Sequence, residues 1–150
     1  MADFPIPTTA VAIADAIHTQ IIASVTGISS RTMRFGEPDS VQTALSMFTL
    51  IDAHEERNAL ATAQNLWRWS FIHVFLFANN DTAVTEQEVV RVLYEVPMLV
   101  RANRFLGTLS KSMALFYDGG TAGYYPIADV LYRSAHIRIT AQEIVYSTAS

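Results

Sequence analysis

Three places in this sequence carry residue types that could do chemistry, and the densest is His54-Glu55-Glu56 with Asp52 just before it. Imidazole and carboxylate groups bind divalent metals and transfer protons. A zinc site on a helix needs a second histidine at a spacing such as HExxH, and this cluster has none. Charged residues of this density usually form a solvated surface. We therefore predict a charged loop here rather than a metal site.

His73 is the second candidate, because a histidine held in a pocket is a common general base. No carboxylate lies two residues away on the same face of its strand. That favours a core histidine with a satisfied ring nitrogen. A partner from another element stays open at this point, and Asp15, His18 or Asp52 could complete an acid–base pair.

The third candidate is the glycine-rich stretch Gly119–Gly123, since such loops can cradle phosphates at the start of a helix. Here it continues as Tyr124-Tyr125-Pro126, with no lysine and no helix pattern. A flexible hairpin loop is the better interpretation. The serines also lack the G-x-S-x-G pattern of a nucleophile. The sequence thus predicts no catalytic, cofactor-binding or metal-binding residue, and we expect the protein not to be an enzyme.

Two helices are predicted from apolar residues at three- and four-residue spacing. The first covers about residues 10–25, capped by Thr8 or Thr9 and stopped by Gly27. The second follows a turn at 79–81 and starts at a capping box of Thr85 and Glu88. Pro97 should bend or split this helix, and Gly107 should end it.

Strands are predicted over five segments, Arg31–Phe35, Ala44–Ile51, Leu66–Phe77, Leu109–Tyr117 and Val130–Ile144. A long hairpin loop at about 52–65 joins the second to the third, and Gly119–Tyr125 lies in the loop before the last. The order α-β-β-β-α-β-β predicts a single α+β domain over 1–150. Its antiparallel sheet has four to five strands, and two main helices pack on it.

The third of these strands, LWRWSFIHVFLF, is the most informative segment of the chain. Because strand side chains alternate between faces, Trp67, Trp69, Phe71, Phe75 and Phe77 share one face with His73. The other face is aliphatic over its second half. Such a strand needs cover on both faces, from a helix layer and from another layer or subunit. The aromatic face is interpreted first as core, with a subunit interface or a ligand pocket as the alternatives.

Composition narrows the classes of function. The chain has 150 residues, 51% of them hydrophobic and 16% charged, with a net charge of −4 and no cysteine. A general nucleic-acid binder would show a basic stripe, and a disulfide scaffold would need cysteines. No signal peptide and no membrane span is expected, since no apolar run approaches the roughly 20 residues of a transmembrane helix.

The order of these pieces resembles the tail terminator, or tail-completion, proteins of long-tailed bacteriophages. The pattern carries three marks of that family: an Arg- and Trp-bearing return strand after a long hairpin, the phrase Ala102–Gly107 (ANRFLG) closing the main helix, and a glycine-rich stretch with Tyr124-Tyr125-Pro126 before an amphipathic last strand. In the family, a phrase similar to N-x-x-L-G commonly ends the main helix.

The resemblance implies a virion structural protein that is assembled in the cytoplasm of a host bacterium. Members form a ring, typically hexameric, that caps the tail tube, stops its polymerisation and joins the tail to the neck of the head. The implied partners are further copies of the chain, the tail tube protein and a head–neck connector or stopper protein. DNA only passes through the lumen, and no cofactor or membrane is involved.

The residues expected at interfaces are Glu55, Glu56 and Arg57 on the hairpin loop, Trp67 and Trp69 on the aromatic strand, and Tyr124 and Tyr125 on the glycine-rich loop. Exposed tyrosines are favoured at interfaces. Two alternatives remain. The chain could be another neck or head-completion component, or it could be a small-molecule enzyme similar to the cone-shaped isomerases and dehydratases.

Overall fold

The α+β architecture predicted from the sequence is the one that the protein adopts. A computed structural model describes residues 10–28, 33–41, 44–61, 64–78, 81–104 and 114–146. Its elements are α1 (Ala10–Ser24), β1 (Met33–Phe35), β2 (Leu45–Ala61), β3 (Gln64–Phe77), α2 (Thr82–Ala102), β4 (Ala114–Ile127) and β5 (Val130–Tyr146). Their order, α-β-β-β-α-β-β, confirms the predicted one.

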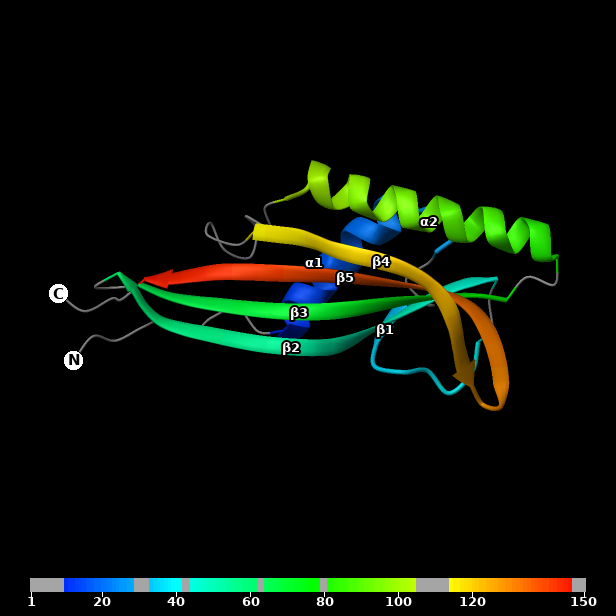
Figure 1. Ribbon diagram of the computed structural model, residues 1–150, viewed down its shortest axis with the longest axis horizontal. Coiled ribbons are helices and arrows are strands. Elements are labelled where there is room, and N and C mark those ends of the chain that lie inside the picture. The colour runs from blue at the N-terminus through cyan, green and yellow to red at the C-terminus, as the bar shows by residue number, and fades with distance from the viewer. Residues whose placement is uncertain are drawn as a thin grey trace.

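A single five-stranded sheet organises the fold, with the strand order β1-β2-β3-β5-β4. β1 pairs parallel to β2, and the three other pairings are antiparallel. Both helices lie on the same side of this sheet, as Figure 1 shows. The sheet therefore has one face under the helices, which we call the helix face, and one open face.

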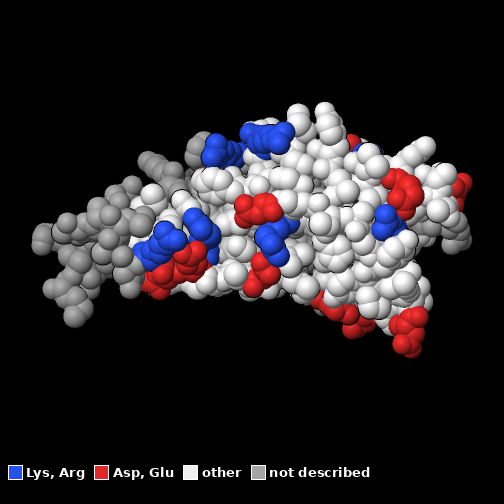
Figure 2. Space-filling model, viewed as in Figure 1, with Lys and Arg blue, Asp and Glu red and all other residues white. Residues whose placement is uncertain are grey.

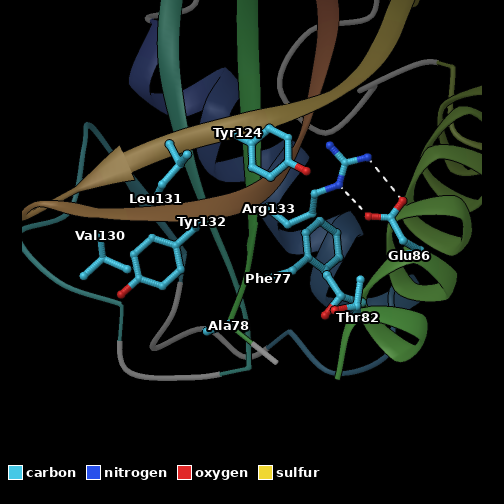
Figure 3. Close-up of a pocket in the computed structure, with 10 residues that line it drawn as sticks. Phe77, Ala78, Thr82, Glu86, Tyr124, Val130, Leu131, Tyr132 and Arg133 are labelled. Carbon is cyan, nitrogen blue, oxygen red and sulfur yellow. Dashed lines mark hydrogen bonds and ion pairs between the residues drawn. The ribbon is translucent and has the colours of Figure 1, made fainter. Parts of the chain in front are cut away.

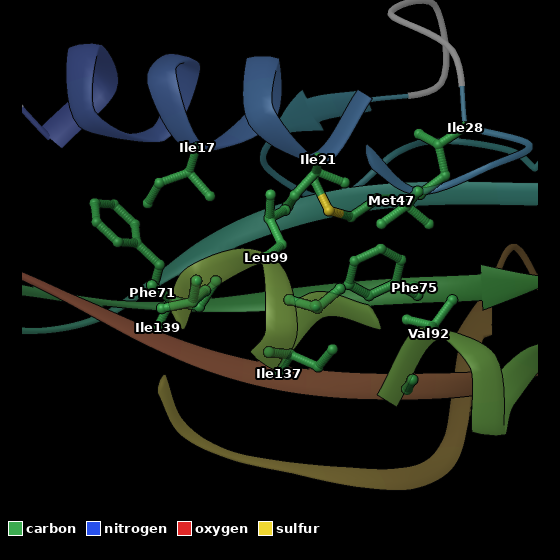
Figure 4. Close-up of a cluster of buried hydrophobic side chains, with 14 of the residues drawn as sticks. Ile17, Ile21, Ile28, Met47, Phe71, Phe75, Val92, Leu99, Ile137 and Ile139 are labelled. Atoms are coloured by element: carbon green, nitrogen blue, oxygen red, sulfur yellow. The ribbon is translucent and has the colours of Figure 1, made fainter. Parts of the chain in front are cut away.

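The aromatic row of β3 lies on the helix face and forms the main core. Phe71 and Phe75 are fully buried there, and Figure 4 shows them among apolar side chains of α1, α2 and β5. Ile17 and Ile21 reach this core from α1, and Val92 reaches it from α2. The interpretation of the aromatic face as core is thus confirmed for its second half.

The other face of β3 is covered at one end by the chain's own hairpin. Val74 and Leu76 are fully buried in a second cluster with Phe48 of β2 and Ile127 of β4. This is possible because the β4–β5 hairpin curls away from the helices, as Figure 1 shows. The sequence predicted that the second face of β3 would need cover from another layer or subunit. Over this part of β3, the chain's own β4–β5 hairpin covers that face.

The segment predicted as a hairpin loop at 52–65 is instead mostly strand. β2 continues through Ala61, β3 starts at Gln64, and the two pair antiparallel past a bulge at Asp52. The polar sequence suits a strand here because cross-strand charges stabilise it, as in the pairing of Glu55 with Arg68. We call residues 52–61 with 64–70 the β2–β3 arm. In Figure 1 it extends past the helices.

The glycine-rich stretch predicted as a loop is also strand. β4 runs through Gly119–Tyr125 with a bulge between Tyr117 and Gly120, and the turn comes only at Ala128-Asp129. β4 is the last strand of the sheet, and an edge strand tolerates glycine bulges and a proline such as Pro126. Local turn signals were therefore outweighed by pairing with β5.

Helix α2 also differs in detail from the prediction. Its N-cap is Asp81, whose carboxylate accepts hydrogen bonds from the backbone N–H groups of Ala83 (3.0 Å) and Val84 (3.3 Å). Thr85 lies inside the helix and is not its cap. Pro97 does not split α2, which ends at Ala102 with Asn103 as C-cap. The expected caps Thr8 and Thr9, the stop at Gly107 and the strand start at Leu109 lie outside the described residues.

Candidate interaction surfaces

The turn between β4 and β5 presents a compact apolar surface, which we call the tip surface: Tyr124, Val130 and Leu131. Their side chains are 62%, 49% and 65% exposed. Ile127 pairs with Val130, so only Ala128 and Asp129 form the loop, with φ of 48° and 67°. Two positive φ values in a two-residue hairpin loop indicate a type I′ turn. Alanine adopts this backbone region only with strain.

A cavity of about 360 Å³ separates this tip from the start of α2. Figure 3 shows it with Phe77 at its base and Tyr124 and Arg133 on one wall, facing Glu86 on the other. The lining residues are Phe77, Ala78, Thr82, Thr85, Glu86, Tyr124, Val130, Leu131, Tyr132 and Arg133. The cavity thus joins the apolar tip to a polar wall.

Arg133 fastens the tip to α2. Its Nε and Nη2 atoms donate to the Glu86 carboxylate at 2.7 and 3.2 Å, and Nη1 donates to the Gly123 carbonyl oxygen at 2.9 Å. The guanidinium lies 4.8 Å from the centre of the Tyr124 ring, within cation–π range. Its hydrogen bonds lower the pKa of Glu86. Arg133 therefore links the tip surface to the start of α2.

A second exposed apolar surface runs along α2. Val90, Tyr94 and Met98 are 66%, 68% and 46% exposed. Their four-residue spacing places them on one side of the helix, away from the buried Val89, Val92 and Val96. We call Val90, Tyr94, Met98 and the exposed Arg101 the α2 outer stripe. An apolar stripe on the solvent side of a helix marks a candidate contact surface.

On the open face of the sheet, the β2–β3 arm carries charge pairs. Glu55 accepts hydrogen bonds from Arg57 (2.7 Å) and Arg68 (3.4 Å), and Arg68 also donates to Gln142 of β5 at 2.8 Å. The hydrogen bond from Arg57 is the main cause that lowers the pKa of Glu55. Glu56 is exposed and pairs in register with Trp67. The open face of the arm is thus polar and internally paired.

The remaining predicted interface residues occupy different environments. Trp67 and Trp69 are half-buried, and the ring of His54 lies 5.1 and 4.0 Å from theirs. Tyr125 is also half-buried: it packs edge-to-face on Phe48, and its hydroxyl donates to Glu37 at 2.8 Å. Of the predicted aromatic residues, Tyr124 is the one that the structure places with its ring mostly in solvent.

His73 lies in a buried hydrogen-bond chain. Thr49 Oγ1 is 2.8 Å from His73 Nδ1 and 2.7 Å from His18 Nε2. Burial lowers the pKa of His73 to about 3, and burial also lowers the pKa of His18, where Asp15 acts in the opposite direction. Since the hydroxyl has one proton, one histidine must donate to it. His73 Nε2 lacks a partner among the described residues. This favours Nδ1–H of His73 as that donor.

Of the partners proposed for His73, His18 is brought to it through the Thr49 hydroxyl, and Asp15 acts on the pKa of His18. Asp52, the other proposed acid, pairs with Arg138 at 3.1 Å on the open face of the sheet. Among the described residues, no group of three or more histidine and carboxylate side chains could hold a metal ion. Nor does any described helix have the length and hydropathy to cross a membrane.

The sequence analysis did not identify the α2 outer stripe, nor Val130 and Leu131 of the tip surface. The signal for the stripe was present, because Val90, Tyr94 and Met98 repeat every four residues beside the buried stripe. Val130 and Leu131 carried no such signal. Alternation along β5 places Leu131 on the same face as the buried Ala135 and Ile137. The start of β5 lies in the curled hairpin, however, and Leu131 is exposed.

Comparisons with known proteins do not assign this chain to a family. No protein-family model matches the chain, and no curated protein matches it. Among the solved structures that match is the sheath/tube terminator of an extracellular contractile injection system, PVC, imaged by cryo-EM in the extended state. The identity is 11% and the TM-score 0.49, over 97% of this chain and 59% of that one. The chain therefore spans well under two thirds of that protein's length.

Proposed function

We propose that this chain is a structural protein that assembles into a ring, caps a tail tube and ends its polymerisation. The observation that carries the proposal is the presence of two separate exposed apolar surfaces on one small domain, the tip surface and the α2 outer stripe. A ring closed by rotation needs two different patches on each subunit, because every contact joins unlike surfaces.

The mechanism is geometric. A ring of these subunits adds to the last layer of a tube through one of its flat sides. Its opposite side does not match a tube subunit, so no further layer adds. The ring also offers that side to the neck of a phage head, where the connector or stopper protein binds. A hexamer is proposed, to match a six-fold tube.

The β2–β3 arm is the proposed contact to a neighbouring ring, through Glu55, Glu56 and Arg57. It extends past the helices, as Figure 1 shows, and Glu56 and Arg57 are exposed there. Surface charges add little affinity but set register and orientation. The arm is therefore suited to align one ring on the next, while the apolar surfaces hold each ring together.

A capping assay tests this function. Tail tubes are polymerised from the tube protein of the same genome, with and without equimolar chain, and their lengths are measured by negative-stain imaging. We expect shorter tubes that carry a ring at one end and do not resume growth when more tube subunit is added. Tubes of unchanged length without end rings would contradict the capping role. Rings that bind the neck connector but not tubes would favour another neck component.

A further inference from the structure

We propose that the α2 outer stripe of one copy packs on the tip surface of the next copy, in a head-to-tail contact. This deepens the proposed function, on which it rests, by naming the two surfaces that form the seam of the ring. The occupant of each surface is a second copy of this chain.

The two surfaces match in character. Each presents three large apolar side chains, and each includes a tyrosine, Tyr94 on the stripe and Tyr124 at the tip. Tyrosine and methionine are enriched at interfaces, and Met98 can adapt its shape to a rigid partner. The cavity beside the tip, lined by Leu131 and Tyr124, gives a protruding side chain of the stripe a place to insert.

Charge complements the apolar match. The C-terminal end of α2 carries Arg101 and Arg104, both exposed, and Arg104 lies 5.1 Å from the centre of the Phe116 ring. The end of the molecule with the tip carries two exposed acids, Asp129 in the turn itself and Glu37, whose carboxylate accepts a hydrogen bond from Tyr125 of β4. Figure 2 shows blue atoms above, near the end of α2, and red atoms below, where the β4–β5 hairpin curls. A stripe-to-tip contact pairs these opposite charges, whereas a tip-to-tip contact would bring acids together.

The tip is also built to stay in place. Arg133 ties it to α2 through Glu86, and the two-residue loop holds Ala128 in a strained backbone region. A rigid surface loses little conformational entropy on binding, so more of the contact energy appears as affinity. The strain is consistent with a turn kept short to present Val130 and Leu131 side by side.

The seam can be tested by cross-linking, because the chain has no cysteine of its own. Met98→Cys is mixed at high concentration with a mass-tagged Val130→Cys variant, and a bismaleimide is added, with and without tail tubes. We expect a cross-linked heterodimer in several-fold higher yield than the pair Met98→Cys with Val11→Cys. Val11 is a matched control, as an exposed apolar residue on α1.

Three results would overturn the proposal. These are a heterodimer yield no higher than the control under both conditions, homodimers of Met98→Cys alone, or homodimers of Val130→Cys alone. The last two would indicate a symmetric contact between like surfaces. This readout is independent of the capping assay. If the heterodimer forms but the protein leaves tube length unchanged, the seam is supported and only the terminator function is contradicted.

Discussion

The two hairpins of this sheet end in opposite ways. The β2–β3 arm is extended and is polar on its open face, where Glu55 pairs with Arg68 across the strands. The β4–β5 hairpin is curled and apolar at its end, closed by a two-residue turn and fastened to α2 by Arg133. Antiparallel strand pairing thus presents two kinds of surface. One is charged and suited to setting the register between subunits, and the other is apolar and suited to holding subunits together. The difference lies in the exposed side chains and not in the backbone topology.

The largest expected effect on assembly follows from placing a charge at the tip. Leu131→Asp should weaken the contact about 30-fold or more, since a central apolar anchor is worth about 2 kcal/mol or more. Glu55→Gln on the arm should leave ring formation intact. Sedimentation velocity of both variants checks this. Equal loss of assembly in both, or in neither, would remove the distinction between the hairpins.

Acid should act on the sheet that both hairpins share. Because the pKa of His73 is lowered to about 3, the unfolded chain binds more protons than the folded one between about pH 3 and 6.5. The free energy of unfolding should therefore be fully retained above pH 6.5. It should fall by up to about 1.4 kcal/mol per pH unit below that pH. Urea unfolding at several pH values measures this slope. If a His73→Phe variant shows an equally steep slope, the pH dependence of stability comes from other groups.

The strain at the tip should be removable. Ala128→Gly should stabilise the domain by roughly 0.5–1 kcal/mol, because glycine adopts positive φ without a Cβ clash, although it loses more entropy on folding. The matched control is Ala53→Gly on the extended arm, which should destabilise by a similar amount. Thermal unfolding of both variants checks the opposite signs. Destabilisation by both would mean that Ala128 is not strained.

The smallest expected effect separates the two arginines that brace the hairpins. Arg133→Ala should lower the Tm slightly and reduce assembly, because the tip loses its bonds to Glu86 and Gly123. Arg68→Ala should lower the Tm no more than that and leave assembly unchanged. Calorimetry and sedimentation together measure both readouts. Normal assembly of Arg133→Ala would show that the tip holds its position without this anchor.

Much of the fold could be predicted from the sequence because the periodic patterns are strong. The alternation in β3 identified the helix face, and the four-residue apolar spacing identified α1 and α2. The two errors in the strands share one cause: strand pairing outweighed local composition. The polar residues 52–61 and the glycines of β4 carry turn and loop signals, yet β3 and β5 supply hydrogen-bonding partners for both. Pairing of this range cannot be read from neighbouring residues.

The candidate surfaces could be predicted only in part. Tyr124 and Tyr125 were both predicted on an exposed loop, but they lie in β4, where Tyr124 is exposed and Tyr125 is half-buried. The exposure of Leu131 could not be predicted, because alternation along β5 cannot show that the hairpin curls out of the helix layer. The sequence offered His18 as a partner of His73, but the bridging role of Thr49 could not be predicted, since the contact joins three elements.

The most direct measurement is the mass of the purified protein by light scattering at high concentration, paired with negative-stain imaging with and without tail tubes. We predict rings with a central hole, in solution or on the ends of tubes, and their loss in Leu131→Asp. A wild-type protein that stays a monomer or dimer, and forms no ring even with tubes present, would contradict the proposed function.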